Sequence, residues 1–317
     1  RGIRNLAYLR TLLGLDLMTM TVSPERVKNI TRATLRKNAS MYWHCIAGQT
    51  VFPVQVAVRF KIPLIIWGAH QGIDQVGMFS HTDEVEMTRK YRKDHDLMGY
   101  EAEELIDESM NIAESDISPY IYPHDKEIEK VGVRGIYLNN YIRWDSKKQH
   151  EEMIELYGYE SGVQRRTFDT YNDVDCFHYS DIHDHIKFLK WGYGKVTDHV
   201  CREIRLKRLT RKEGIDLIDR YSTIKPETLP LFLKWIGITE SGLNYFVDRR
   251  RDSVIWQGTD DGSWKLKDSI LEHKEDKDTD AVKLGKKEGC EFKITPSKIK
   301  NPGNNEYTLI GRGYVNL

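Results

Sequence analysis

Short apolar runs alternate with helical stretches over roughly the first 120 residues of this chain. The clearest run is 62–67, IPLIIW, in which apolar residues follow one another without helical spacing. Such a run is typical of a strand buried on both faces of a parallel sheet. We therefore expect an α/β fold in this part of the chain.

The segments before this run complete the α/β rhythm. Leucines at helical spacing predict a helix over 5–13 that ends at Gly14, and weak alternation predicts a short strand over 16–22. Ser23 followed by Pro24 predicts a helix start. Strands and helices joined by short connections indicate a parallel sheet, so two helices are expected before the apolar run, to about 37 and over 47–60.

The middle of the chain is more polar and its periodicity is weaker. We expect a charged helix or ordered loop over 82–98, a boundary at the proline-rich 118–123, and Gly158 as a helix stop. The remaining expected elements are a helix over 101–110, a strand and turn over 133–142, and a helix over 146–156.

From residue 182 onward the pattern is helical. Thr210 and Glu213 have the spacing of a capping box. The polar segment 272–288 lacks the apolar residues that a packed core requires. The expected helices are 182–190, 197–207, 210–221, 226–236 and 239–248, and 291–294 is expected to pair with 307–315 as a small terminal sheet.

Composition excludes several classes of protein. Lys and Arg number 48 and so do Asp and Glu, so we expect no nucleic-acid partner. Four scattered cysteines form neither a disulfide framework nor a zinc ribbon, and they suit a reducing cytoplasm. Because no apolar run approaches the roughly 20 residues of a membrane helix, we expect no membrane span.

The apolar run ends in small and polar residues. Gly68, His70 and Asp74 follow it, and open α/β sheets bind ligands at the carboxyl ends of their strands. Asp74 could hold Mg²⁺ on a triphosphate, and His70 could donate to a phosphate or a base. The alternative is an ordinary polar loop after a strand.

Cysteine and histidine are concentrated at two further places. Cys45, next to His44, is either a buried small side chain or a group with a chemical role. A second group does not fit a standard zinc spacing, so we favour a polar wall of a substrate pocket over a metal site; its members are Asp175, Cys176, His178, His183 and His185.

The segment 190–211 contains many Lys and Arg residues together with Asp and His, which can act in acid–base catalysis. A Gly-Tyr-Gly turn precedes Asp198 and His199, which could serve in acid–base chemistry although neighbours on a helix do not face each other. The alternative to a ligand site is a solvated basic face. Three guanidinium groups three residues apart would suit a phosphate or carboxylate, namely Arg202, Arg205 and Arg208.

Several of these segments resemble the N-acetyl sugar amidotransferase family of surface-polysaccharide biosynthesis. The resemblance covers roughly residues 2–256, and its most distinctive part is LKWGYGKVTDHVCREIRLKRLTRKEGIDLI. Other matching pieces are GIRNLAYLR, YWHCIAG, VQVAVRFKIPLIIWG and YLNNYIRWD. The first half also resembles the ATP-pyrophosphatase (PP-loop) superfamily, in which a strand ends in Gly-His and then Asp, as in WGAHQGIDQ.

The resemblance implies a reaction, two cofactors and a partner. Enzymes of this kind use ATP and Mg²⁺ to adenylate the acetamido oxygen of a sugar, and ammonia then displaces AMP to give an acetamidino sugar. The sugar would be nucleotide-activated or a nonulosonic acid. A separate glutaminase, similar to that of histidine biosynthesis and often joined by a cyclase-like subunit, would supply the ammonia.

The resemblance also implies roles for individual residues. Catalytic roles fall to Lys190, Asp198 and His199. The sugar would be bound by Tyr193, Thr197, Arg202 and Arg205. The cofactor site would hold ATP through Gly68, His70, Asp74 and Cys45, with Asp74 on the metal ion.

One family feature is absent from this sequence. The Ser-Gly-Gly-x-Asp-Ser phosphate loop should lie upstream of GIRNLAYLR, so we expect a piece of a longer protein that is inactive alone. The expected fold is an incomplete parallel Rossmann-like sheet of the adenine nucleotide α-hydrolase type, followed by a mostly helical region. The expected division is a truncated α/β domain over 1–120, a helical substrate and partner region over 121–256, and a polar tail over 257–317.

Two other functions fit parts of the pattern. The chain could be a tRNA-modifying enzyme of the same superfamily, against which its balanced charge counts. It could also be a non-catalytic scaffold of the glutaminase complex, as the missing phosphate loop would allow.

Overall fold

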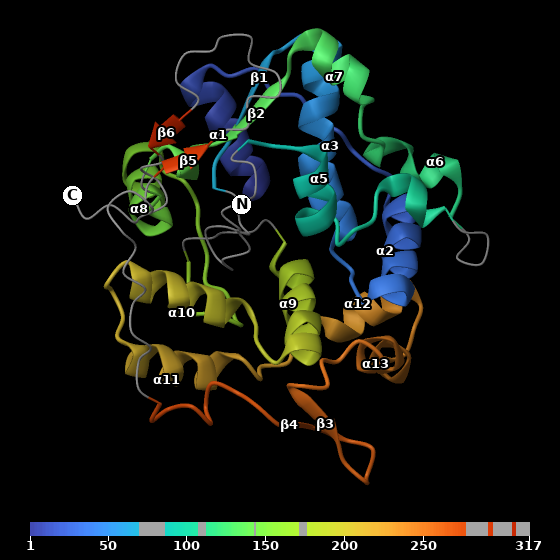
Figure 1. Cartoon of the computed structure of the whole chain (residues 1–317), viewed down its shortest axis with the longest axis vertical. Coiled ribbons are helices and arrows are strands. Elements are labelled where there is room, and N and C mark those ends of the chain that lie inside the picture. Colours follow the sequence, from blue (N-terminus) through green and yellow to red (C-terminus); the bar gives the residue numbers. More distant parts are fainter. Residues whose placement is uncertain are drawn as a thin grey trace. The chain divides into compact units, whose positions relative to one another are not determined.

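The computed structural model describes residues 1–69, 86–106, 112–142, 144–170 and 176–276 and the short strands at 291–293 and 306–308 (Figure 1). Contacts divide the chain into two compact units that interleave along the sequence. Unit 1 consists of Arg1–Tyr42 and Asp145–Asp276, and unit 2 of Trp43–Trp144 and Lys277–Leu317. The division into domains ending at 120 and 256 stays a prediction.

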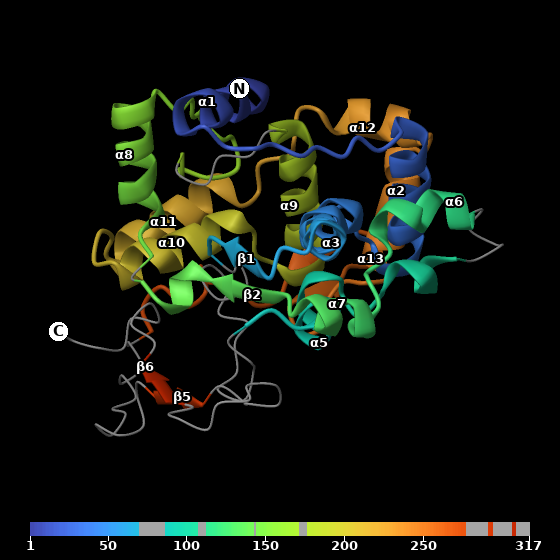
Figure 2. The same cartoon turned by 90° about the horizontal axis from the view of Figure 1, so that it is seen from above.

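The fold is mixed α/β and mostly helical, and unit 2 contains a small parallel sheet. Helix α3 (Trp43–Phe60) leads into strand β1 (Leu64–Trp67), and helix α7 (Asp125–Val131) leads into β2 (Arg134–Tyr137). The two strands lie side by side next to α3 (Figure 2), in parallel with Leu64 opposite Arg134 and Trp67 opposite Tyr137. Within the described residues this sheet has two strands, so a complete Rossmann sheet is not seen there.

Strand β1 is covered on one face, and the prediction of burial on both faces is wrong. Ile65 packs against the core formed by Val51 and Val54 of α3. The alternate residues Leu64 and Ile66 are 45% and 57% exposed. Successive side chains of a strand point to opposite faces, and α3 covers only the face that holds Ile65.

The rest of unit 2 is built from short elements. The charged segment predicted over 82–98 is described from residue 86, where it forms a short helix α5 (Arg89–Tyr91) followed by a π-helical turn η1 (Arg92–Asp96). The helix expected over 101–110 is, where described, the 3₁₀ turn η2 (Ala102–Leu105). Helix α6 (Glu114–Ile117) and the 3₁₀ turn η4 (Ser118–Tyr120) follow, and η5 (Leu138–Asn140) confirms the turn expected after β2.

Unit 1 begins with two helices that the sequence predicts. Helix α1 (Gly2–Leu13) ends at Gly14, whose φ of 62° lies in the left-handed region that glycine adopts readily. Helix α2 (Pro24–Asn38) begins with its proline in the first turn. The strand expected over 16–22 is wrong, because this segment is irregular and pairs with none of the described strands.

The remaining helices of unit 1 confirm the expected helical region. Thr210 accepts a hydrogen bond from the Glu213 amide at 3.3 Å, and Glu213 accepts one from the Thr210 amide at 2.8 Å, so the capping box is present. The helices are α8 (Ser146–Tyr157), α9 (Phe177–Trp191), α10 (Lys195–Arg205), α11 (Arg211–Tyr221), α12 (Leu229–Ile236) and α13 (Glu240–Asp248).

Two cores hold these helices together. The larger core joins α2, α9, α12 and α13 through side chains such as Leu35, Ile186, Ile236 and Val247. The smaller core joins α10 to α11, which lie side by side in Figures 1 and 2, through Val196, Val200 and Ile218. Helix α10 contributes only two buried aliphatic side chains to this core, Val196 and Val200.

Two antiparallel strand pairs complete the described chain. Strands β3 (Trp256–Gly258) and β4 (Trp264–Leu266) form a hairpin that the sequence analysis does not predict. Strands β5 (Glu291–Lys293) and β6 (Glu306–Thr308) confirm the expected terminal pairing, with Phe292 opposite Tyr307. Among the described helices, none is long and apolar enough to cross a lipid bilayer.

Candidate functional site

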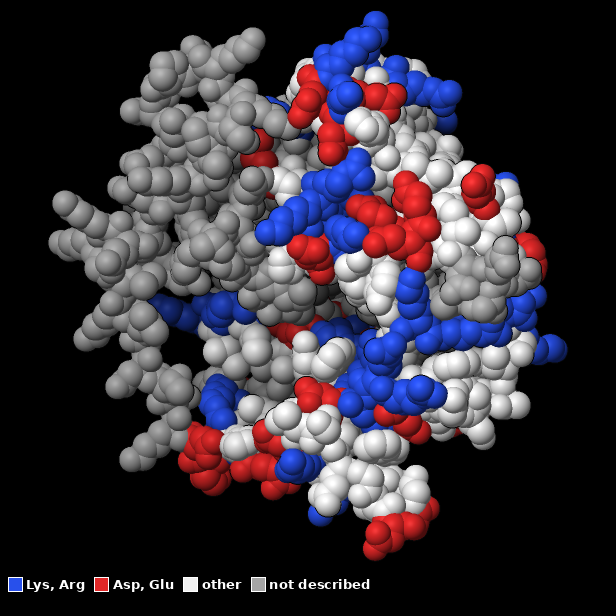
Figure 3. All heavy atoms as spheres, turned by 45° about the vertical axis from the view of Figure 1, so that its right-hand side comes forward, with Lys and Arg blue, Asp and Glu red and all other residues white. Residues whose placement is uncertain are grey.

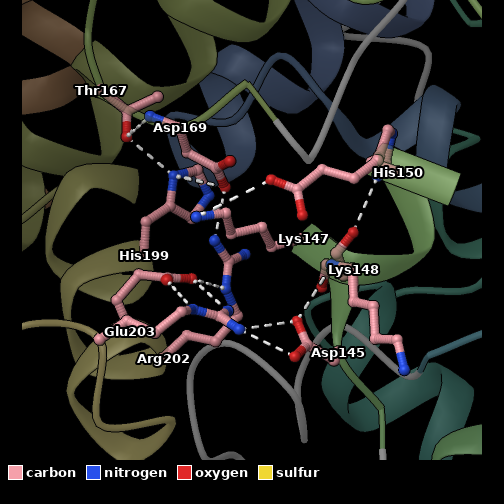
Figure 4. Close-up of polar contacts among 12 residues, drawn as sticks. Asp145, Lys147, Lys148, His150, Thr167, Asp169, His199, Arg202 and Glu203 are labelled. Atoms are coloured by element: carbon pink, nitrogen blue, oxygen red, sulfur yellow. Dashed lines mark hydrogen bonds and ion pairs between the residues drawn. The ribbon is translucent and has the colours of Figure 1, made fainter. Parts of the chain in front are cut away.

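Charged side chains of α10 are buried in unit 1 in a connected set that we call the inner network. Its members are Asp145, Thr167, Asp169, His199, Arg202, Glu203 and Arg208. Figure 4 labels all of them except Arg208. Thr167 Oγ1 lies 2.8 Å from His199 Nδ1, and Asp169 Oδ2 lies 3.3 Å from the same nitrogen. Asp169 also accepts a hydrogen bond from Arg202 Nη2 at 2.7 Å, so one carboxylate holds both side chains of α10.

The network continues to the start of α8. Arg202 Nε donates to Glu203 at 3.0 Å, and Arg208 Nε donates to the other Glu203 oxygen at 2.5 Å. Arg208 Nη1 lies 2.9 and 2.8 Å from the two oxygens of Asp145, the residue that precedes α8. The network thus ties the C-terminal half of α10 to the N-terminus of α8.

Burial makes these contacts energetically important. Asp169 is fully buried, and Arg202 and His199 are 2% and 3% exposed. Burial lowers the pKa of His199 to about 4, although Asp169 opposes the shift, so the imidazole is neutral near pH 7. Burial alone would raise the pKa of Glu203, but hydrogen bonds from Arg208 and Arg202 outweigh it and lower that pKa. A buried charge that loses its partner costs about 3–5 kcal/mol.

The turn between α9 and α10 is fixed by Asp184. Its Oδ1 accepts a hydrogen bond from the Lys195 amide at 2.5 Å, and its Oδ2 pairs with Arg166 Nε at 2.7 Å. A Cβ at Gly194 would lie 2.9 Å from Asp184 Oδ1, closer than real Cβ atoms approach. Glycine is therefore required at 194 by lack of space, because its φ of −129° is open to other residues.

A second, less buried group lies between α9 and α10, and we call it the outer group: Lys187, Tyr193 and Asp198. Lys187 Nζ donates to Asp198 Oδ2 at 2.6 Å and lies 4.4 Å from the centre of the Tyr193 ring. Tyr193 is 39% exposed. Burial raises the pKa of Asp198, and the nearby Lys187 opposes the shift. The outer group combines a carboxylate, an ammonium group and an accessible aromatic ring.

The residues expected to be catalytic lie in three different environments. Asp198 faces Lys187, and His199 faces Thr167 and Asp169. Lys190 Nζ donates to the carbonyl of Asn38 at 3.3 Å. No catalytic pair of Asp198 with His199 is seen, in agreement with the rule that adjacent helical residues diverge.

The expected row of three arginines on one helix face is wrong. Arg202 is buried, Arg205 is exposed, and Arg208 lies beyond the end of α10. Three residues of an α-helix complete about 300° of a turn, so each arginine points about 60° away from the previous one. A row at this spacing therefore diverges around the helix. Thr197, also expected at the sugar, is half-buried on α10.

The residues expected at the nucleotide are only partly described. The sequence places Cys45 just before the helix expected over 47–60, but α3 begins four residues earlier, at Trp43, so Cys45 lies in its first turn. Its Sγ is 3.3 Å from His44 Nδ1. Gly68 directly follows β1. His70 and Asp74 lie outside the described residues, so their roles stay predictions.

Aromatic side chains gather at the described end of β1. The rings of Trp67 and Tyr137 stack with centroids 6.5 Å apart, and a Cβ at Gly68 would touch the Trp144 ring at 3.1 Å. Trp67 Nε1 is buried and has no hydrogen-bond partner. Aromatic rings offer flat apolar faces, and a buried donor without a partner can contact a polar ligand. Among the described residues, no glycine-rich loop is arranged to cradle phosphates.

The described residues of the predicted histidine and cysteine group, Cys176, His178, His183 and His185, do not surround a common point. His183 stacks on Tyr42 with ring centroids 4.5 Å apart, and Cys176 and His178 are exposed. Burial lowers the pKa of both His183 and His185 to about 4. Within the part of the chain that the structure describes, no set of His, Cys, Asp and Glu side chains is arranged to hold a metal ion. Asp175 lies outside it.

Sequence reasoning missed the partners of α10, namely Asp145, Thr167, Asp169, Asp184 and Lys187. A usable signal was present in the helix itself. The buried residues of α10 include Asp198, His199, Arg202 and Glu203 but only two aliphatic residues, Val196 and Val200. A short helix of this composition must find charged partners elsewhere, although the sequence does not say which.

One comparison with known proteins matches the segment that contains most of this site. Residues 165–270 match the family model described as LPS biosynthesis protein WbpG-like, C-terminal domain. The match confirms the resemblance for this segment, which includes the outer group and the inner network except Asp145. No curated protein matches the chain.

Proposed function

Because residues 165–270 belong to the WbpG-like C-terminal domain family, we propose that the chain acts in lipopolysaccharide biosynthesis. In this proposal it is part of an ATP-dependent amidotransferase that converts the acetamido group of a sugar into an acetamidino group. The domain match is the observation that carries the proposal. The parallel pair β1 and β2, ending in Gly68 and aromatic rings, supports a nucleotide-binding sheet of the Rossmann-like type.

ATP, when bound with Mg²⁺, supplies the adenylyl group that turns the acetamido oxygen into a leaving group. In unit 2, Trp67 and Tyr137 would hold the base, and Asp74 stays our candidate for the metal ion. The ammonia would come from a partner glutaminase. An amide carbonyl is a poor electrophile, so the protein must also orient the sugar and move a proton from the incoming nitrogen.

We assign the sugar contact to the outer group rather than to the inner network. Asp198 would accept a proton at its carboxylate, and Lys187 holds that carboxylate at 2.6 Å. The accessible ring of Tyr193 offers a flat surface for a sugar. His199 is buried and its pKa is about 4, so it suits holding α10 in place better than acting as a base.

The test follows pyrophosphate release by the natural gene product that contains this chain. It is incubated with ATP, Mg²⁺ and ammonium, and with either nucleotide-linked acetamido sugars, free acetamido nonulosonic acids or tRNA. We expect AMP and pyrophosphate in equal amounts only with an acetamido sugar. Release only with tRNA would contradict the proposal in favour of a tRNA-modifying enzyme. Absence of pyrophosphate release with every one of these acceptors would favour the non-catalytic scaffold.

The same assay tests the outer group. Asp198→Asn should lower turnover at least tenfold, because the amide cannot accept the proton. Lys225→Gln is the matched control, since Lys225 pairs with Glu240 at the surface of the same unit. Equal turnover of Asp198→Asn and the unaltered enzyme would remove Asp198 from the reaction.

A further inference from the structure

Two cationic side chains meet at the C-terminal end of α2. Lys190, in the last turn of α9, donates from Nζ to the carbonyl of Asn38 at 3.3 Å. Arg250, two residues beyond α13, donates from Nη2 to the carbonyl of Lys37 at 2.6 Å. Three separate helices of unit 1 thus bring these charges to one place.

Neither cation has a carboxylate partner among the described residues. The nearest carboxylates along the chain are engaged elsewhere, because Asp248 pairs with Arg251 at 2.7 Å and Asp252 accepts from the Val254 amide at 2.8 Å. The last turn of α2 adds the basic residue Arg36. Positive charge therefore gathers here against the partial negative charge of the α2 C-terminus, and neither cation is paired with a carboxylate among the described residues.

The other lysines of this region provide a contrast. Lys187 and Lys195 each lie 2.6 Å from a carboxylate, that of Asp198 and that of Asp181. Burial and the neighbouring Arg250 lower the pKa of Lys190 to about 8. An anion bound beside Lys190 would stabilise its charged form and so oppose both the burial and the repulsion from Arg250. Figure 3 shows one face of the molecule, on which Lys and Arg side chains lie beside Asp and Glu in places and gather elsewhere with few acidic neighbours.

An aromatic ring lies next to this pair. Trp191 is 45% exposed, and its ring centre is 5.8 Å from Lys190 Nζ. Exposed rings next to a cation offer a flat apolar surface and a charge-assisted donor together. This combination suits a sugar that carries an oxyanion.

We propose that Lys190 and Arg250 form a binding site for the phosphate or carboxylate group of the acetamido sugar, with Trp191 beside its ring. The anion site follows from the geometry of the two cations, and its assignment to a sugar rests on the proposed function. Arg250 keeps N–H groups besides the one given to Lys37, and Lys190 keeps two, so donors remain for an oxyanion.

Calorimetric titration of the protein at low salt tests the site. The probes are inorganic pyrophosphate, N-acetylneuraminic acid for a carboxylate, and N-acetylglucosamine as a neutral sugar. Lys190→Gln and Arg250→Gln should each weaken binding of the preferred anion about tenfold and leave the neutral sugar unaffected. Lys225→Gln, which removes a charge that is paired with Glu240, should bind all probes normally. The anion that binds more tightly shows whether the site prefers a phosphate or a carboxylate group.

A second measurement needs no variant. Acetylation of the unaltered protein at pH 8, followed by peptide mass spectrometry, compares Lys190 with Lys187 and Lys195. The anion should slow acetylation of Lys190 several-fold and leave the other two unchanged. The site would be overturned if the anion protected all three lysines equally or protected none of them. It would also be overturned if the two Gln variants bound the anion as tightly as Lys225→Gln does.

The experiments distinguish a failure of the anion site from a failure of the proposed function. If pyrophosphate binds through Lys190 and Arg250 but no acetamido sugar supports pyrophosphate release, the anion site stands and the amidotransferase is wrong. If sugars support release but the two variants bind anions normally, only the anion site is wrong.

Discussion

Asp169 is the residue on which the inner network depends. Its carboxylate is fully buried and contacts both His199 and Arg202, and Arg202 Nη1 is already buried without a partner. Loss of its charge would leave a guanidinium group buried beside a neutral amide. The sequence could not single out Asp169, because it lies 30 residues before His199 in a segment without periodicity.

We therefore expect Asp169→Asn to lower the free energy of unfolding by about 1.5–3 kcal/mol, because Arg202 loses one charged acceptor and keeps Glu203 as the other. Urea unfolding followed by circular dichroism measures the change. Glu240→Gln is the control, because it breaks an exposed pair with Lys225 and should have little effect. Similar losses for the two variants would show that Asp169 is not specially important.

A glycine in the turn before α10 gives a second prediction at this scale. Gly194→Ala should destabilise the protein by about 1–3 kcal/mol, because Asp184 is held by Arg166 and by the Lys195 amide and cannot retreat from a new methyl group. Gly242→Ala is the control: its Cβ would make ordinary contacts of 3.5 and 3.7 Å inside α13. A stable Gly194→Ala protein would mean that Asp184 can move.

At the scale of elements, the sequence predicted best where local signals suffice. The caps at Gly14, Gly158 and Thr210 and the helices from α9 to α13 are confirmed. Local rules failed where an element depends on a neighbour. The segment 16–22 finds no partner strand in the part of the chain that the structure describes, and β1 is half exposed because α3 covers only one of its faces. Hydrophobic runs report the need for burial and cannot report which side is covered.

The capping box of α11 provides a test at this scale. Thr210→Ala should cost about 1 kcal/mol, because it leaves the Glu213 amide without its acceptor. Thr223→Ala, an exposed threonine in the turn after α11, is the matched control and should be neutral. The unfolding midpoints in urea compare them, and equal stability would mean that water replaces the cap.

For the whole molecule, buried neutral histidines govern the response to acid. Burial lowers the pKa of His44, His183, His185 and His199 to about 4. In the unfolded chain a histidine binds its proton near pH 6.5. Between these values the unfolded state binds more protons, so acid favours unfolding.

We expect the melting temperature to be nearly constant between about pH 7 and pH 8 and to fall between pH 6.5 and 4. Each histidine contributes at most about 3 kcal/mol to the loss. His183→Asn should flatten this fall, whereas His273→Gln should not, because His273 is exposed and lies beside Asp268 and Asp276. A melting temperature that is independent of pH in this range would show that these histidines are not buried as neutral groups.

Most helices, their caps, and the resemblance that the WbpG-like match confirms for residues 165–270 could be predicted from the amino-acid sequence. These features depend on residues close together in the chain. Which side chains meet could be learned from the folded structure alone. It separated Asp198 from His199, dispersed three arginines, joined Asp169 to Arg202, and brought Lys190 and Arg250 to the end of α2. Such meetings depend on how helices pack, and spacing along one helix does not contain that information.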